Sequence, residues 1–316
     1  MKRARLLLVL AIALGLLLAA LSVTVLVFLS RPPVLVVTDL PFAALYGENR
    51  LRSRQLSASA ALFRQVRPVL IADDASPDML IAAISYASEN PFLVLFPRRF
   101  AAVAERFHRE SPEIPVVVFR GAVPAAEMPA GNGIFSVYGT DRATDLFRAG
   151  LFAGIIGSMG RGGLRDEVPD AGLPVAQRTH VLWQDRFMTH EGRELFSGAA
   201  RERDPDSAVV FVGTAAAMPD TRGVSSMVMA GAGADYLERN PGIPVILFSW
   251  LNPDLTSGEV VAMFDDSPWA LVVPATRMAA EGIAVGVIPS KPLIFSDRIA
   301  DNGVTRAIRR SAGRVP

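Results

Sequence analysis

The sequence predicts an α/β protein with two lobes, each built around a doubly wound, mostly parallel sheet, preceded by one N-terminal transmembrane helix. Short apolar runs rich in β-branched residues alternate with longer helix-like segments from Val34 to about residue 295. These runs are apolar on both faces, as expected of parallel strands that helices cover on both sides. About 280 residues of this pattern would ordinarily divide into two compact lobes.

The N-terminal segment predicts a membrane span. Leu6–Leu29 contains no charged residue and is preceded by Lys2, Arg3 and Arg5. As a helix it would rise about 36 Å, which exceeds a hydrocarbon core of about 30 Å. The positive-inside rule places the N-terminus in the cytoplasm. Everything after Arg31 would then lie on the periplasmic or extracellular side of the cell inner membrane.

A cleaved signal peptide is the alternative for this segment. The apolar region of a signal peptide is usually only about 7 to 15 residues long and ends in small residues. Here the apolar run is longer, and bulky Val, Leu and Phe side chains occupy its end. An uncleaved anchor is therefore favoured over a cleaved signal.

The remaining chain divides into segments by its strand pattern. The expected units are an N-terminal anchor or signal segment (1–33), lobe one (34–139), lobe two (140–274), and a return to lobe one that ends in a basic tail (275–316). The candidate strands are Val34–Thr38, Pro68–Ala72, Phe92–Phe96, Val116–Phe119, Ile134–Tyr138, His180–Trp183, Ala208–Val212, Val245–Ser249, Ala270–Val273 and Ala284–Ile288.

Helix starts and loops complete this outline. Ser76-Pro77-Asp78 combines a capping hydroxyl, a proline suited to the first turn and an acid that favours the positive end of the helix dipole. Helices are also expected at Arg142–Met159 after Asp141, at Gly223–Arg239 after Asp220 and at Ser257–Phe264 after Thr256. Two segments rich in turn formers, Gly121–Gly133 and Gly160–Arg178, are expected to be loops.

Composition excludes several classes of function. The chain has 316 residues, a net charge of +1, no cysteine and three histidines. Disulfides, thiolate metal sites, a cysteine nucleophile and a lipid-modified N-terminal cysteine are therefore excluded, and nucleic-acid binding is not favoured. No nucleophile elbow, Walker loop, zinc-protease motif or dinucleotide fingerprint follows a strand, so no enzyme, cofactor or metal is predicted.

The order of segments resembles the type I periplasmic substrate-binding proteins, whose fold is shared with the ligand-binding half of LacI-like repressors. The first strand leads into DLPFAALYGENR, and SPDMLIAAI and PFLVLFP follow. GIFSVYGTDRATDLFRAGLFAGIIGSMG resembles the crossover into lobe two, and RFMTHEGRELFSGAARERDPDSAVVFVGT a helix and strand of that lobe. The resemblance implies a binder of a small polar solute that serves an ABC-type transporter or a sensor partner.

Within that superfamily, Gly139–Gly160 and VVFVGT are most similar to the basic-membrane-protein branch, which includes purine-nucleoside binders. That branch has an Asp-x-Ser-Phe-Asn-like opening loop and a late Gly-x-Asp motif. This chain instead has DLPFAAL and VVPATRM at those positions. Loss of the expected acid raises the alternative of a degenerate relative that binds no solute and acts as a membrane-anchored scaffold or assembly factor.

Candidate ligand-binding residues follow from the rule that open α/β sheets bind ligands at the carboxyl ends of their strands. Aromatic rings stack on flat ligands or sugar faces, and arginine offers a planar fork to anions. Tryptophans also pack between lobes, and Asp220 also suits a helix cap, so each of these residues has a purely structural interpretation. The candidates are Asp39, Phe42, Tyr46, Arg98, Arg99, Arg120, Trp183, Arg186, Asp220, Trp250, Asn252 and Arg277.

Overall fold

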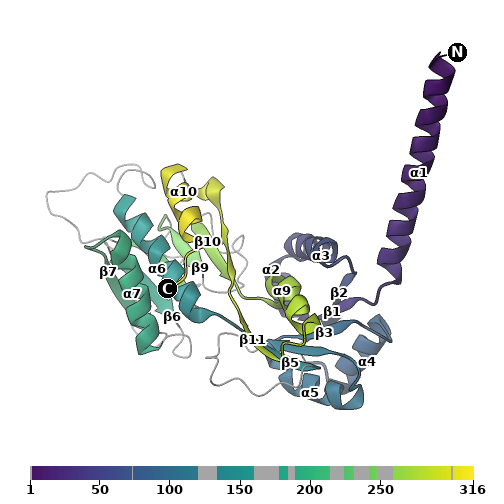
Figure 1. Ribbon diagram of the computed structural model, residues 1–316. Helices are drawn as coiled ribbons and strands as arrows, with labels where there is room; N and C mark the ends of the chain where they lie inside the picture. The colour runs from purple at the N-terminus through teal and green to yellow at the C-terminus, as the bar shows by residue number, and fades with distance from the viewer. Residues whose placement is uncertain are drawn as a thin grey trace.

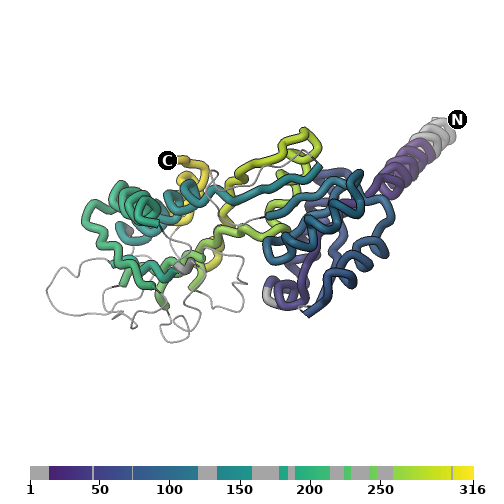
Figure 2. Tube along the Cα trace, turned by 90° about the horizontal axis from the view of Figure 1, so that it is seen from below, coloured from purple at the N-terminus to yellow at the C-terminus, as the bar shows by residue number. Residues whose placement is uncertain are grey.

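The computed structural model describes residues 2–72, 74–119, 134–159, 178–183, 189–213, 224–230, 242–247, 259–299 and 302–316. Over these residues the chain forms two six-stranded sheets, called sheet A and sheet B here. Figures 1 and 2 show the sheets as two neighbouring bodies, lobe one and lobe two. The loops predicted at Gly121–Gly133 and Gly160–Arg178 lie outside the described residues, apart from Arg178.

Sheet A is fully parallel, in the order β11-β5-β4-β3-β1-β2. Alternate residues of β1 enter opposite hydrophobic clusters, Val34 and Val36 on one face and Leu35 and Val37 on the other. Burial on both faces explains why the sequence of this strand shows no polar alternation. Its strands are β1 (Val34–Asp39), β2 (Val66–Ile71), β3 (Leu93–Phe96), β4 (Val116–Phe119), β5 (Phe135–Thr140) and β11 (Val285–Ile288).

Helices cover both faces of sheet A (Figure 1). α2 (Leu40–Tyr46), α3 (Glu48–Leu62) and α9 (Pro268–Ala280) contribute side chains to one cluster. α4 (Pro77–Ala87) and α5 (Ala101–Glu110) pack on the other face, and a short 3-10 helix, η1 (Arg98–Phe100), precedes α5. The hydroxyl of Ser76 accepts a hydrogen bond from the backbone N–H of Met79, which confirms the capping signal.

Sheet B has the order β12-β10-β9-β8-β6-β7, with β12 antiparallel to β10 and the other pairs parallel. α6 (Arg142–Met159), α7 (His190–Arg203) and α10 (Asn302–Ser311) pack on one face. A second cluster on the other face includes Met227, Val245 and Met263. The strands are β6 (Arg178–Trp183), β7 (Ala208–Gly213), β8 (Val224–Ala230), β9 (Val245–Leu247), β10 (Val260–Asp265) and β12 (Lys291–Ile294).

Three segments of the described chain connect the two sheets. The first joins β5 to α6, the second joins β10 to α9, and the third joins β11 to β12. The sequence predicts a return to lobe one over 275–316. In the structure α9 already packs on sheet A, whereas β12 joins sheet B and α10 packs against α6. The end of the chain therefore belongs to lobe two, because Val304 and Ile308 complete its core.

Three predicted elements differ from the structure. The expected helices Gly223–Arg239 and Ser257–Phe264 overlap strands β8 and β10, because their apolar runs are buried as inner strands of sheet B. The expected strand Ala270–Val273 lies within α9. Ser267 caps this helix and Pro268 occupies its first turn, which is the same signal as at Ser76.

The N-terminal helix α1 spans Lys2–Ser30 and stands away from the rest of the chain (Figure 1). Within the described residues, no helix combines the length and the apolar character needed to cross a membrane. The span predicted at Leu6–Leu29 falls within α1.

Two glycines allow α6 and α7 to pack closely. A Cβ atom at Gly150 would lie 2.4 Å from the backbone oxygen of Phe196, and one at Gly154 would lie 2.3 Å from that of Ala200. Backbone atoms cannot rotate away as a flexible side chain can. The contact between these helices therefore requires glycine at both positions.

We expect Gly150→Ala to lower the free energy of unfolding by about 1–3 kcal/mol, because the helices must separate to admit the methyl group. Gly198→Ala is the matched control on α7, since its Cβ would meet nothing within 4 Å. That control should be neutral or stabilising by up to about 1 kcal/mol. Urea unfolding of both variants measures the difference, and equal effects would contradict the packing argument.

Candidate functional site

The carboxyl edge of sheet A carries a charged pair. Asp39 ends β1, and its Oδ1 accepts a 2.7 Å hydrogen bond from the N–H of Phe42, so it caps α2. Its Oδ2 lies 3.3 Å from Nη1 of Arg99, which follows the neighbouring strand β3. β1 and β3 are neighbouring parallel strands, so the segments that follow them begin at the same edge of the sheet. Asp39 and Arg99 therefore lie close together although they are far apart in the sequence.

A buried hydrogen bond joins the two lobes. The hydroxyl of Tyr46, in α2, donates to Oδ2 of Asp265 at 2.7 Å, and both residues are 0% exposed. Asp265 ends β10 of sheet B, where its Oδ1 also accepts from the N–H of Ser267. Burial raises the pKa of Tyr46, and the carboxylate of Asp265 raises it further. The phenol therefore stays protonated as a donor.

Asp266, the next residue, has a buried carboxyl oxygen, Oδ1, for which the described residues provide no hydrogen-bond partner. Burial raises its pKa to about 7, with a further contribution from Asp265. Arg142, at the start of α6, opposes that rise. Burial lowers the pKa of Arg142, Asp266 raises it, and the charge of Arg98 lowers it. Asp266 and Arg142, which come from two inter-lobe segments, are thus close enough to interact electrostatically.

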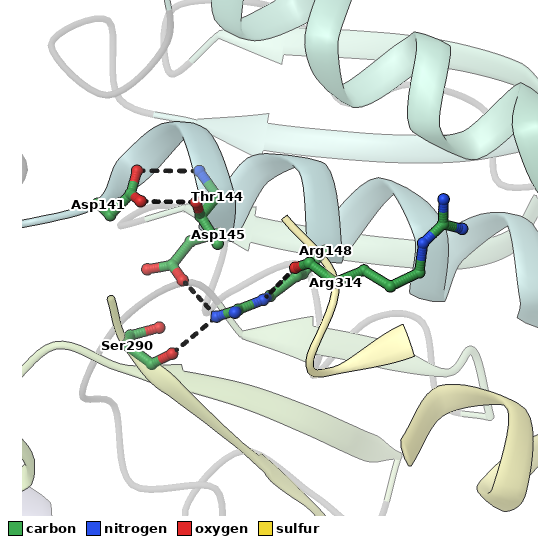
Figure 3. Close-up of polar contacts among 6 residues, drawn as sticks. All are labelled: Asp141, Thr144, Asp145, Arg148, Ser290 and Arg314. Carbon is green, nitrogen blue, oxygen red and sulfur yellow. Dashed lines mark hydrogen bonds and ion pairs between the residues drawn. The ribbon is translucent and has the colours of Figure 1, made fainter. Parts of the chain in front are cut away.

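The first and third inter-lobe segments are tied together and to the C-terminus (Figure 3). Arg148 is buried on α6, where its Nη1 donates to the carbonyl of Ser290 at 3.1 Å and its Nε donates to the carbonyl of Arg314 at 2.9 Å. Asp141 caps the same helix through the N–H and the hydroxyl of Thr144. These bonds fix the position of the start of lobe two.

Asp145 is the buried acid of this cluster. One of its carboxyl oxygens lies 3.9 Å from Nη1 of Arg148. Burial raises the pKa of Asp145 to about 7, and the carboxylate of Asp141 adds to the rise, while Arg148 opposes it. The group therefore changes charge near neutral pH at the junction of the two lobes.

The structure brings some of the predicted site residues together. Asp39, Phe42, Tyr46 and Arg99 lie at the carboxyl edge of sheet A, where the rings of Phe42 and Tyr46 stack with their centroids 5.1 Å apart. Arg98 is exposed and acts electrostatically on Arg142. The positions at Arg120, Arg186, Asp220, Trp250 and Asn252 lie outside the described residues.

Trp183 and Arg277 are not part of this group of residues at the edge of sheet A. Trp183 is 5% exposed in the core of lobe two, edge-on to Phe211 and beneath the guanidinium of Arg193. Arg277 is exposed in the last turn of α9. The sequence predicts a strand at Ala270–Val273 and therefore Arg277 near a strand end, but this segment lies within helix α9.

Sequence reasoning did not identify Arg142, Asp265 and Asp266 as site residues. An Asp-Asp pair directly after the apolar run VVAMF was the available signal, but that run was assigned to a helix. Arg142 was treated only as part of a helix start. Over the described residues, no group of three or more His, Asp or Glu side chains is arranged to hold a metal ion.

Comparison with known proteins gives the fold. No known family profile matches the sequence, and no curated protein matches it. The structure is similar to an ABC transporter solute-binding protein from Conexibacter woesei, with a TM-score of 0.58 and 12% identity over 91% of this chain and 99% of the other.

Two further solved structures are similar to the chain over most of its length. A transcriptional activator of the comK gene from Bacillus halodurans has a TM-score of 0.53 and 16% identity over 90% of this chain and 100% of the other. AraP, an arabinose-binding protein from Geobacillus stearothermophilus, has a TM-score of 0.52 and 14% identity over 84% and 98%. The chain therefore has the two-lobed fold of the periplasmic binding proteins.

Removal of the bond between the lobes should cost stability. We expect Tyr46→Phe to lower the free energy of unfolding by about 1–3 kcal/mol, because it leaves a buried carboxylate oxygen without its donor. Tyr86→Phe is the control, since that side chain is 95% exposed. Chemical unfolding of both variants tests this, and an unchanged Tyr46→Phe protein would show that the bond contributes nothing.

Asp145 should make stability depend on pH. Its pKa is about 7 in the folded protein and about 3.9 when unfolded. The folded state therefore holds the proton more tightly, and stability falls as pH rises between these values. From about pH 5 to about pH 8, the free energy of unfolding of the wild type should fall by roughly 2 kcal/mol more than that of Asp145→Asn.

Asp78→Asn is the control for this measurement, because the side chain of Asp78 is 76% exposed in a surface ion pair. The free energy of unfolding of Asp78→Asn should change with pH as that of the wild type does. Asp266 titrates in the same window, and the charge of Asp145 contributes to its raised pKa, so the difference between the wild type and Asp145→Asn includes this coupling. If the free energy of unfolding of Asp145→Asn and of the wild type changed identically with pH, Asp145 would not be the group that titrates near pH 7.

Proposed function

We propose that this protein is an extracytoplasmic solute-binding protein that holds a small polar ligand between its lobes, for an ABC-type transporter or a sensor partner. The observation that carries the proposal is the pair formed by Asp266 and Arg142. Both groups come from segments that connect the lobes, and the acid has a buried oxygen without a partner among the described residues. A ligand hydroxyl supplies the missing hydrogen-bond partner.

The surroundings of this pair suit a polar solute. Arg98 and Arg142 provide forked donors, and Asp266 serves as a donor or an acceptor because its pKa is about 7. The solved relatives include an arabinose-binding protein, which makes pentoses the first ligands to test. The partial resemblance to nucleoside binders adds purine nucleosides to that panel.

A membrane attachment through α1 belongs to the same proposal. Over residues 14–29 of this helix, most apolar side chains are exposed; Leu14, Leu17 and Leu26, for example, are 57%, 65% and 65% exposed. Its hydroxyls are satisfied internally, since Ser22 donates to the carbonyl of Leu18 and Thr24 to that of Ala20. An apolar exterior with internally bonded hydroxyls suits a lipid environment. We infer an inner-membrane attachment with the lobes outside the cytoplasm.

A scaffold or assembly role without solute is the second candidate, and specific contacts favour it. Asp39 already pairs with Arg99, and Tyr46 already pairs with Asp265. Three of the predicted ligand-binding residues, Asp39, Arg99 and Tyr46, are therefore engaged within the protein. In a scaffold these pairs would persist in every state, whereas in a binder the solute would replace at least one of them.

Two measurements decide between a solute-binding protein and a scaffold. Native mass spectrometry of the freshly purified protein detects retained solute, and calorimetry tests pentoses, hexoses, nucleosides and amino acids. We expect one class to bind and Arg142→Met to weaken that binding about tenfold or more, because a charged hydrogen bond is lost. Arg109→Met, a change at the last turn of α5, is the control and should bind as the wild type does. Absence of any bound or titratable solute would favour the scaffold.

A further inference from the structure

The junction between α1 and lobe one is built from aromatic rings and arginines. The rings of Phe28 and Phe63 meet edge to face with centroids 5.8 Å apart. The guanidinium of Arg31 lies 4.9 Å from the centroid of the Phe63 ring. Phe63 ends α3 in the left-handed conformation, with φ of 49°, and is the only residue other than glycine with positive φ among the described residues. This conformation places the ring against α1.

Two more arginines lie beside this junction. The guanidinium of Arg64 lies 3.9 Å from the centroid of Phe92, and its Nη1 donates to the carbonyl of Pro32 at 3.2 Å. Arg67 donates to the side chain of Gln65 and to the carbonyl of Ala87. Burial lowers the pKa of Arg64, and the charge of Arg31 lowers it further, so these two cations are close enough to repel each other.

Within the part of the chain that the structure describes, these three arginines share the lack of an acidic partner. Among the described residues, no carboxylate forms an ion pair with Arg31, Arg64 or Arg67, whereas other arginines do find acids, namely Arg54, Arg99, Arg106, Arg148 and Arg314. Carbonyl groups and aromatic faces orient the three guanidiniums without neutralising them. Their positive charge therefore remains available to an external anion.

The position of the junction indicates which anion fits. It lies at the amino ends of the strands of sheet A, where the N–H of Val34 donates to the carbonyl of Gln65 and that of Phe92 to the carbonyl of Pro33. The apolar helix α1 begins its projection at this edge (Figure 1). Aromatic rings beside basic side chains at the end of an apolar helix are typical of residues at the lipid headgroup level.

We propose that Arg31, Arg64 and Arg67 bind the phosphate groups of anionic phospholipids in the membrane that holds α1. The inference rests on the attachment of α1 to a membrane. The candidate solute site lies at the carboxyl edge of the same sheet, about 20 Å away for a six-residue strand. Lipid contact at the amino edge therefore leaves the solute site directed away from the bilayer.

The full chain, reconstituted in nanodiscs of phosphatidylcholine with phosphatidylglycerol, tests this proposal. The protein is released from the nanodiscs in the mass spectrometer, and the lipids that stay bound to it are counted by native mass spectrometry. We expect phosphatidylglycerol to be enriched at least about threefold over its share of the nanodisc, and 0.5 M NaCl to remove the enrichment, because the contact is ionic. The salt experiment uses the wild-type chain and does not depend on the folding of a variant.

Arg31→Gln combined with Arg64→Gln should bring the retained lipids back to the bulk ratio. Arg306→Gln combined with Arg310→Gln is the matched control, since these arginines are exposed on α10 of lobe two. Equal enrichment in both double variants would overturn the proposal. Loss of the enrichment on addition of millimolar inorganic phosphate in low salt would also overturn it, because the surface would then bind free phosphate in preference to lipid.

The failure of this inference is distinguishable from that of the proposed function. A chain that does not enter nanodiscs lacks the membrane attachment, and both the attachment and the lipid surface then fail. A chain that inserts and retains lipids at the bulk ratio keeps its attachment but has no anionic-lipid surface. Solute binding is measured separately by calorimetry and is independent of both results.

Discussion

The chain must pass between its two sheets three times, and this constraint places buried polar groups where the lobes join. Each passage must leave one sheet and enter the other. The N–H of Asp141 donates to the carbonyl of Ile288, and Arg148 reaches the carbonyl of Ser290, so the first and third segments are bonded to each other. Tyr46 fixes the second segment through Asp265. The lobes are thus joined by buried polar bonds.

The charges at this junction differ in how completely the protein satisfies them. Asp265 has bonds from Tyr46 and Ser267, and Arg54 lies 3.5 Å away. Asp145 and Asp266 have fewer partners, and burial raises the pKa of each to about 7. Buried groups that are only partly satisfied cost stability and are common where a ligand or a conformational change completes the contacts. Asp145 and Asp266 are two such groups, and both lie where the lobes join.

Much of the fold follows from local sequence signals. The apolar run of β1 and the Ser-Pro-Asp signal at α4 were interpreted correctly, because one is a strand buried on both faces and the other is a helix cap that acts within four residues. The elements in the second half of the chain were harder to predict. The run of β10 contains alanine and methionine, which also suit a helix, and only burial between β9 and β12 makes it a strand.

The site was less predictable than the fold for the same reason. Asp39 could be named because it follows a recognisable strand, and so could Tyr46, although its partner is 219 residues away. The partner itself could not be named while β10 was assigned to a helix. Arg148 lies in the middle of α6, and only the tertiary structure brings it to Ser290 and the C-terminal segment. Contacts of this kind depend on topology and have no local signature.

The exchange of segments between the lobes also determines when the protein can fold during its synthesis. Sheet A receives β11 only after all of β6 to β10 has been made, and sheet B receives β12 and α10 at the very end of the chain. Until then, the edge of β5 that later pairs with β11 is an open strand edge. Neither lobe is complete when its first half leaves the ribosome. Contacts of such long sequence separation slow folding, and they make the nascent chain dependent on protection from aggregation.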